Sequence, residues 1–350
     1  MDEHDLMTLR ERIGDKHLRR RLRAQVDRMI QTSGMGRGRF HYENLPLFVH
    51  AVKLVLRVTG LGSRGERNAL TLTVRENPVV LPGLPPALDG LRILHLSDMH
   101  LDGRPGFGLH IARTVADLDF DLCVLTGDFR FHDTGRYVHL GEEVKAMLPV
   151  LCRKACRLGV YGILGNHDFI EMVPLLEAAG VRLLLNEAVR VTENGAALWL
   201  VGLDDAHFYG LHDFDKALRD VPPASRELRI LLAHSPEVIP EASERGFQLY
   251  LTGHTHAGQI CLPGGWPPMV NARCSRRYIA GAWTFNGMVG YTSRGTGSSG
   301  VFVRFNCPPE VVIHILRGDD NPLPTLRLRS RQDSGEEEGA GEQRGQTASP

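Results

Sequence analysis

The chain has 350 residues, of which 42% are apolar and 23% charged, and its formal net charge is zero. This composition is ordinary for a globular protein, and the balance of charge excludes a protein whose overall field draws it to nucleic acid or to a membrane. No apolar run reaches the roughly 20 residues of a membrane-spanning helix, and the acidic start from Met1 to Asp5 is not followed by the apolar stretch of a secretory signal. The six cysteines form no CxxC pair, which favours buried free thiols in a reducing cytoplasm.

The first 62 residues are predicted to form a helical extension. Apolar residues recur at helical spacing from Leu6 to Met29, and a basic block that includes Arg19 and Arg21 lies between them, so this stretch is predicted to be a basic amphipathic helix. After a polar, glycine-rich break, residues 45–58 are apolar on most faces and carry two cations, which suits a helix in a membrane interface. Two interpretations remain open: these segments pack on the rest of the chain or on a second subunit, or they contact a membrane surface.

From Leu91 onward, short apolar runs alternate with helical stretches, and this alternation predicts an α/β or α+β architecture. The expected strands are 70–74, 91–96, 122–126, 160–164, 198–201, 230–232, 249–251, 288–291, 301–305 and 311–315. The expected helices are 108–118, 137–157, 172–179 and 214–218, and a turn is expected at 82–86. Residues 318–350 consist of Arg, Glu, Gly and Ser with almost nothing to bury, so they are predicted to be a disordered tail.

Five of the expected strands are followed, within a few residues, by residue types that bind metal ions. They are Asp98 and His100 after 91–96, Asp128 after 122–126, Asn166 after 160–164, His234 after 230–232, and His254 and His256 after 249–251. Loops at the carboxyl ends of strands in such sheets converge, so we expect these side chains to form one site. A lone Asp or His in such a place is usually structural, and His95, His110, His132, His207, His212 and His314 are given no role in the site, but five coincidences favour a metal centre.

The ligand types indicate which metals would bind. Two carboxylates, one amide oxygen, four imidazoles and no thiolate suit manganese, iron or zinc, with manganese favoured, whereas structural zinc would favour cysteine and calcium would favour oxygen alone. A bridging carboxylate can hold two cations roughly 3.5–4 Å apart with a water between them, which supplies both a nucleophile and an electrophile for a phosphate. His167, next to Asn166, is expected to assist the leaving oxygen as a catalytic group, and Asp168 to orient its ring and raise its pKa.

These motifs, in this order, resemble those of the calcineurin-like metallophosphoesterases over residues 91–316: Asp-x-His, Gly-Asp, Gly-Asn-His-Asp, a single His and Gly-His-x-His. The resemblance implies a four-layer sandwich of two mixed β-sheets flanked by α-helices, with the extension at 1–62, this domain at 63–317 and the tail at 318–350. It implies one metal held by Asp98, His100, Asp128 and His256, and a second held by Asp128, Asn166, His234 and His254, with Asp128 bridging. It also places His167 at the phosphate.

Within that superfamily, the segments 232–236 and 253–259 resemble a bacterial subgroup with Leu-x-His-x-Pro and Gly-His-Thr-His-x-Gly-Gln. Residues 127–131 lack the Asp-Arg-Gly of protein Ser/Thr phosphatases, which disfavours that branch. The subgroup includes general phosphodiesterases and hydrolases of UDP-2,3-diacylglucosamine in lipid A synthesis.

The expected function is therefore hydrolysis of a phosphodiester or pyrophosphate, such as that of a lipid-linked nucleotide sugar. The enzyme would be cytoplasmic, or peripheral on the inner face of the membrane through residues 1–60, with no nucleic acid partner. A broad phosphomonoesterase and a metal-bound scaffold without turnover remain alternatives.

Overall fold

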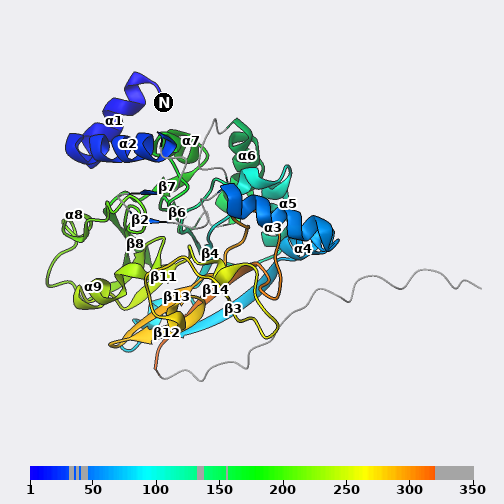
Figure 1. Ribbon diagram of the computed structural model, residues 1–350. Coiled ribbons are helices and arrows are strands. Elements are labelled where there is room, and N and C mark those ends of the chain that lie inside the picture. Colours follow the sequence, from blue (N-terminus) through cyan, green and yellow to red (C-terminus); the bar gives the residue numbers. More distant parts are fainter. Residues whose placement is uncertain (31–34, 37–38, 41–45, 132–137, 155–156, 320–350) are drawn as a thin grey trace, which may run out of the picture.

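The computed structural model describes residues 1–30, 35–36, 39–40, 46–131, 138–154 and 157–319. Two six-stranded β-sheets stack on each other, and helices cover their outer faces (Figure 1). The predicted sandwich of two mixed sheets flanked by helices is therefore confirmed. No helix within the described ranges combines the length and the apolar character needed to cross a bilayer.

The first sheet has the order β3-β14-β4-β5-β6-β7. Its strands are β3 (Thr73–Val80), β14 (Glu310–Arg317), β4 (Arg92–Leu96), β5 (Leu122–Leu125), β6 (Val160–Gly162) and β7 (Val181–Leu183). The strands from β4 to β7 are parallel, and β14 runs antiparallel to β4. Every residue of β5 is buried, as expected for a parallel strand that is covered on both faces.

The second sheet has the order β12-β13-β11-β10-β9-β8. Its strands are β12 (Gly281–Phe285), β13 (Met288–Thr292), β11 (Leu249–Thr252), β10 (Leu228–Leu232), β9 (Ala196–Gly202) and β8 (Glu187–Glu193). The four inner strands are parallel, while both edge strands are antiparallel to their neighbours. Ile93 and Val124 of the first sheet share a buried core with Leu200 and Leu251 of the second, so the two sheets pack face to face.

Helices cover the other face of each sheet. On the first sheet these are α1 (Glu3–Ile13), α2 (Asp15–Ile30), α5 (Phe107–Val115), α6 (Val138–Lys154) and α7 (Val173–Ala178). On the second sheet they are α8 (Phe214–Ala217) and α9 (Ile239–Glu244). Two further helices, α3 (Pro46–Val58) and α4 (Gly62–Leu70), lie side by side, and a two-stranded ribbon of β1 (Met35–Gly36) and β2 (Arg39–Phe40) precedes them.

The open question about the N-terminal helices is answered for α1 and α2. Leu9, Ile13 and Leu18 are buried in the same core as the first sheet and its helices. Arg12 of α1 also forms ion pairs with Glu177 and Glu187. These two helices therefore pack on the rest of the chain. They are separate helices because Gly14, with φ 85°, ends the first one.

Two predicted strands are wrong in part or in full. The strand predicted at 70–74 begins only at Thr73 and continues to Val80, because it pairs along its whole length with β14. Residues 301–305 form no strand: Arg304 N donates to Gly65 O and Phe305 N donates to Gln259 O, so the backbone hydrogen bonds go to two separate segments. Strands β7, β8 and β12 were not predicted. Residues 320–350 of the predicted tail lie outside the described part of the chain.

Candidate metal centre

The structure brings all seven predicted ligands together at the carboxyl ends of strands from both sheets. Asp98 and His100 follow β4, Asp128 follows β5 and Asn166 follows β6, all in the first sheet. His234 follows β10, and His254 and His256 follow β11, in the second sheet. None of the seven is more than 7% exposed. The site therefore lies where the two stacked sheets present their loops to each other.

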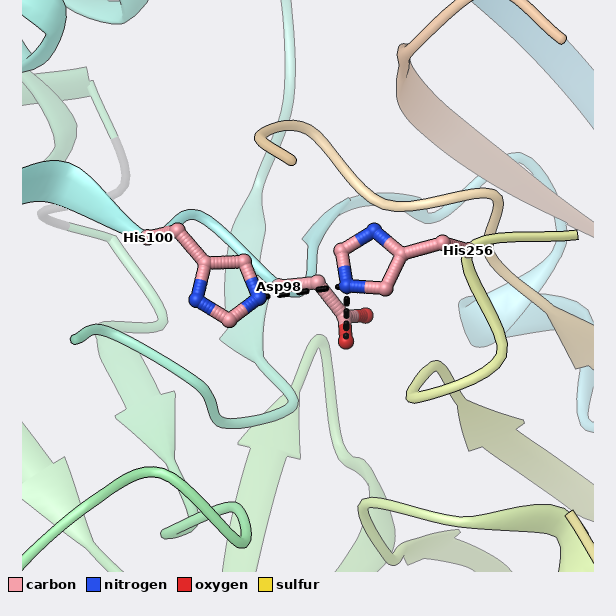
Figure 2. A group of neighbouring side chains, drawn as sticks. All are labelled: Asp98, His100 and His256. Atoms are coloured by element: carbon pink, nitrogen blue, oxygen red, sulfur yellow. Dashed lines mark hydrogen bonds and ion pairs between the residues drawn. The ribbon is translucent and has the colours of Figure 1, made fainter. Parts of the chain in front are cut away.

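Asp98, His100 and His256 form one group that could hold a metal ion (Figure 2). The Nε2 atoms of His100 and His256 face each other at 3.1 Å, and His256 Nε2 lies 3.5 Å from Asp98 Oδ1. Two buried imidazole nitrogens and a carboxylate oxygen directed at one point form a donor set that suits a divalent transition metal.

Asp128, His234 and His254 form the second group, and Asn166 lies within it. Asn166 Oδ1 lies 2.9 Å from His234 Nε2 and 2.9 Å from His254 Nδ1. Asp128 Oδ2 lies 3.3 Å from His234 Nε2 and 3.8 Å from His100 Nε2. One carboxylate oxygen thus lies between the two groups, which is the position that a bridging ligand requires.

Hydrogen bonds to the backbone fix the orientation of two of the imidazole rings. His100 Nδ1 lies 2.5 Å from the carbonyl oxygen of Arg130, and His234 Nδ1 lies 2.8 Å from that of Thr126. Because a carbonyl only accepts, each Nδ1 must donate, so in the neutral ring the lone pair of Nε2 is directed into the site. This arrangement is typical of histidines that bind metal ions in proteins.

The backbone at the site is strained. Five candidate ligands have a positive φ: Asp98, His100, Asp128, His254 and His256. Such a conformation costs of order 1–3 kcal/mol in a residue other than glycine and is concentrated at functional sites. Glycine is required before two of the ligands because the chain approaches a carboxylate closely there. A Cβ on Gly165 would collide with the carboxylate of Asp128, and one on Gly253 with that of Asp98. The Gly-Asn and Gly-His motifs thus allow a close approach of loops.

The site also perturbs the acidity of its members. Burial acts to raise the pKa of Asp128, but the charges of His234 and His167 hold it well below its usual value. Burial acts to lower the pKa of His234, but Asp128 raises it to about 10. Burial holds the pKa values of His254 and His256 well below the usual value for histidine. Since a metal binds carboxylate and neutral imidazole, Asp128, His254 and His256 are near the required state, and a metal would displace the proton of His234.

The two predicted catalytic residues lie beside these ligands. His167 lines the cavity of the site, its ring lies edge-on to that of His100 with centroids 5.0 Å apart, and its backbone nitrogen donates to Asp128 Oδ1. The carboxylate of Asp168 accepts hydrogen bonds from the backbone nitrogens of Asp128, Phe129, Arg130 and Gly165. Asp168 therefore holds the turn that carries Asp128, and its expected effect on the His167 ring stays a prediction.

Arg21 was expected on the basic face of an amphipathic helix, but the structure buries it completely behind the site. Its Nη2 donates to the carbonyl oxygen of Asp168 at 3.0 Å, and its Nε lies 3.5 Å from Asp204 Oδ1. The guanidinium also lies 3.5 Å from the ring centroid of Tyr209. Sequence reasoning missed this residue because one arginine within a run of arginines carries no signal of burial.

A cavity of about 260 Å³ opens beside the candidate ligands. It is lined on one side by Asp128, Asn166, His167, His254 and His256. Its other walls come from α3 and from the segments 258–271 and 299–301. This cavity is the candidate substrate site, because it is the concave surface that several of the candidate ligands line.

Comparisons with known proteins agree with this geometry. The family described as calcineurin-like phosphoesterase matches residues 91–258. The chain is 27% identical over 241 residues to an uncharacterized metallophosphoesterase, YkoQ, of Bacillus subtilis, covering 65% of this chain and 84% of that protein. It is 30% identical over 235 residues to the phosphodiesterase YaeI of Escherichia coli, covering 63% of this chain and 80% of that protein.

A further relative is a transmembrane protein with a metallophosphoesterase domain from Bos taurus, which is 31% identical over 299 residues. That match covers 78% of this chain but spans only 62% of the length of the relative.

Proposed function

This chain belongs to the calcineurin-like phosphoesterase family and is a hydrolase of phosphate esters, and we propose that its buried centre binds two divalent cations and cleaves a phosphodiester or a pyrophosphate. One cation would be held by Asp98, His100, Asp128 and His256, and the other by Asp128, Asn166, His234 and His254. The observation that carries the proposal is the position of Asp128 Oδ2 between the two groups of ligands. The donor set suits manganese, iron or zinc, and we favour manganese.

When bound, the two cations supply a water of lowered pKa and neutralise the charge of the phosphate. His167 is the group that we assign to the leaving oxygen. Its ring lines the cavity beside the ligands, and its backbone is fixed by the hydrogen bond to Asp128. Such assistance by proton transfer is worth typically about 10²–10⁴ in rate. Asp168 supports the same site, because its four backbone hydrogen bonds fix the turn at Asp128 and the loop at Gly165.

We favour a diester or pyrophosphate over a monoester, and the relative YaeI bears the name of a phosphodiesterase. A finer form of the proposal is a lipid-linked nucleotide sugar such as UDP-2,3-diacylglucosamine, hydrolysed by a peripheral enzyme on the inner face of a membrane. Of the first 60 residues, α3 supports such a location, because Leu54, Val55 and Val58 are exposed on it. Helix α2 does not, since its apolar side packs on the first sheet.

Hydrolysis of bis(p-nitrophenyl) phosphate by the full chain, with and without added manganese, tests the reaction class. We expect turnover that depends on the metal, with two metal ions per chain on the same preparation. A fully loaded protein that hydrolyses no phosphate ester would contradict the proposal and favour a scaffold. A parallel assay with UDP-2,3-diacylglucosamine tests the finer form, which fails if this compound is not hydrolysed by an enzyme that cleaves the nitrophenyl diester.

A further inference from the structure

The wall of the cavity that lies away from the candidate ligands is apolar. It is formed by Val49 and Val52 of α3 and by Ile260, Met269, Val270 and Val301. The same cavity is lined on its other side by Asp128, His167 and His256. A molecule bound there would therefore have its phosphate at the polar end and an adjoining group against aliphatic side chains.

Three polar side chains that line the cavity have partners within the protein. The amide nitrogen of Gln259 donates to the carbonyls of Ser299 and Val301, and its oxygen accepts from Ser299 N. Thr255 Oγ1 donates to the carbonyl of Ile279, and Asn271 Nδ2 lies 3.3 Å from His207 Nε2. Among the described residues that line the cavity there is also no lysine or arginine. The lining residues that the structure describes thus offer no cation for a second anionic group, and these three polar side chains already have partners within the protein.

Helix α3 has an unusual environment for an apolar helix. Val49, Val52 and Leu56 are only half-buried on the side that includes the cavity. Leu54, Val55 and Val58 on the remaining surface are 61%, 59% and 77% exposed. Met269, which also lines the cavity, and Trp266, three residues before it, are exposed as well. An apolar surface therefore continues from the inside of the cavity to its rim.

We propose that this wall binds an apolar chain of the substrate, so that the enzyme acts on an amphiphile in which the phosphoester carries an alkyl group or a comparable aliphatic group. The inference rests on the proposed function and names its substrate class. The volume of about 260 Å³ lies just below the roughly 300–1,000 Å³ of pockets for drug-sized ligands. The cavity thus holds the phosphate and the first methylenes of the chain, and the remainder lies along α3.

A series of p-nitrophenyl alkyl phosphates tests this proposal, with methyl, butyl and octyl groups kept below their aggregation concentrations. The full chain is loaded with manganese, and nitrophenolate release is followed. We expect kcat/KM to rise by about fourfold for each of the first methylenes, because each is transferred from water to an apolar wall. The variant Val52→Asn should lower the butyl-to-methyl ratio of kcat/KM by about tenfold, since it places an amide against the chain.

The control is Ala51→Asn, which makes the same type of change on the same helix at an exposed position outside the cavity lining. It should retain the butyl-to-methyl ratio. Equal kcat/KM for methyl and butyl esters would overturn the inference, as would an equal loss of the butyl-to-methyl ratio in both variants.

A preference for the longer esters that appears only above the aggregation concentration, or only with vesicles, would assign the apolar surface to a membrane. A preference that changes with protein concentration would assign it to a second copy. Either result overturns the inference, whereas failure to cleave any ester is the failure of the proposed function.

Discussion

Replacement of Arg21 by methionine is the most direct test of how α2 contributes to the site. Methionine keeps an unbranched apolar stem but removes the guanidinium, which contacts the carbonyl of Asp168, the carboxylate of Asp204 and the ring of Tyr209. After the change, Asp204 would keep the side-chain hydrogen bond to His17, whose Nε2 lies 2.8 Å from its Oδ2. The Asp168 carbonyl would lose a buried donor.

The expected loss follows from the burial of the pair. Removing one partner of a buried ion pair costs about 3–5 kcal/mol, because the other charge is left buried and uncompensated. Both Arg21 and Asp204 have fully buried side chains, and His17 partly compensates the carboxylate. We therefore expect the free energy of unfolding of Arg21→Met to fall by about 3 kcal/mol. This is a large part of the 5–15 kcal/mol typical of native proteins.

The loss should depend on pH. Burial acts to raise the pKa of Asp204, but Arg21 and His17 hold it below its usual value. A carboxyl group whose pKa is lower in the folded state adds stability above its pKa in the unfolded state, about 3.9, and this stability is lost as the pH falls through the folded value. The difference between the variant and the original protein should therefore be full at neutral pH and shrink below about pH 4.

Urea unfolding at saturating manganese, followed by tryptophan fluorescence, measures the effect. The matched control is Arg19→Met on the same helix, where the side chain is 76% exposed and pairs with the nearby Asp15. Exposed pairs of this type contribute roughly 0.3–0.5 kcal/mol, so the control should be almost as stable as the original protein. Equal stability of the two variants would refute the packing of Arg21. The packing of Arg21 would also be refuted if Arg21→Met kept its stability but lost binding to lipid vesicles.

Three other changes address the site and the core. Asp128→Asn should reduce the metal content at both positions, because the carboxylate lies between the two groups of ligands; one tightly held ion per chain by elemental analysis would contradict a bridging role. His167→Ala should lower kcat by about 10²–10⁴-fold at unchanged metal content, and loss of metal would make His167 a ligand. Burial lowers the pKa of His95 to about 3, so it is neutral in the fold. The free energy of unfolding should fall by up to about 1.4 kcal/mol per pH unit as the pH drops below about 6.5, where the unfolded chain gains a proton on this residue. His95→Gln should flatten the denaturation profile, and an unchanged slope would refute this origin.

The positions of the candidate ligands could be predicted from the sequence because their signals are local. An apolar run such as 122–126 indicates a buried strand, and a ligand directly after it must lie at the carboxyl end. Parallel neighbours then place the ends of β4, β5 and β6 at one edge without further information. The glycines before Asn166 and His254 were visible in the same motifs, although their reason, a collision with the carboxylates of Asp128 and Asp98, needed the structure.

Other features depend on contacts between segments that are distant in the sequence, and these could not be predicted. The burial of Arg21 requires Asp204, which lies more than 180 residues later in the chain. The apolar run at 301–305 has the composition of a strand but bonds to Gly65 and Gln259 in different segments. The cavity wall combines Val52 with Met269 in the same way. In each case the composition of the segment correctly indicates an apolar or basic stretch, but the residues that it contacts are distant in the sequence.

Two N-terminal helices contribute residues next to the site, and the ligand motifs do not include them. Each group of ligands includes residues from both sheets: Asp98 with His256 in one, and Asp128 with His234 in the other. These positions are set by the stacked sheets and fix the reaction chemistry. Behind the site, Arg21 of α2 contacts the carbonyl of Asp168, whose carboxylate holds the turn at Asp128. Helix α3 forms part of the cavity wall. Within this family fold, then, the sheets provide the candidate metal centre, while the first 58 residues supply one of its supports and part of the wall of the adjoining cavity.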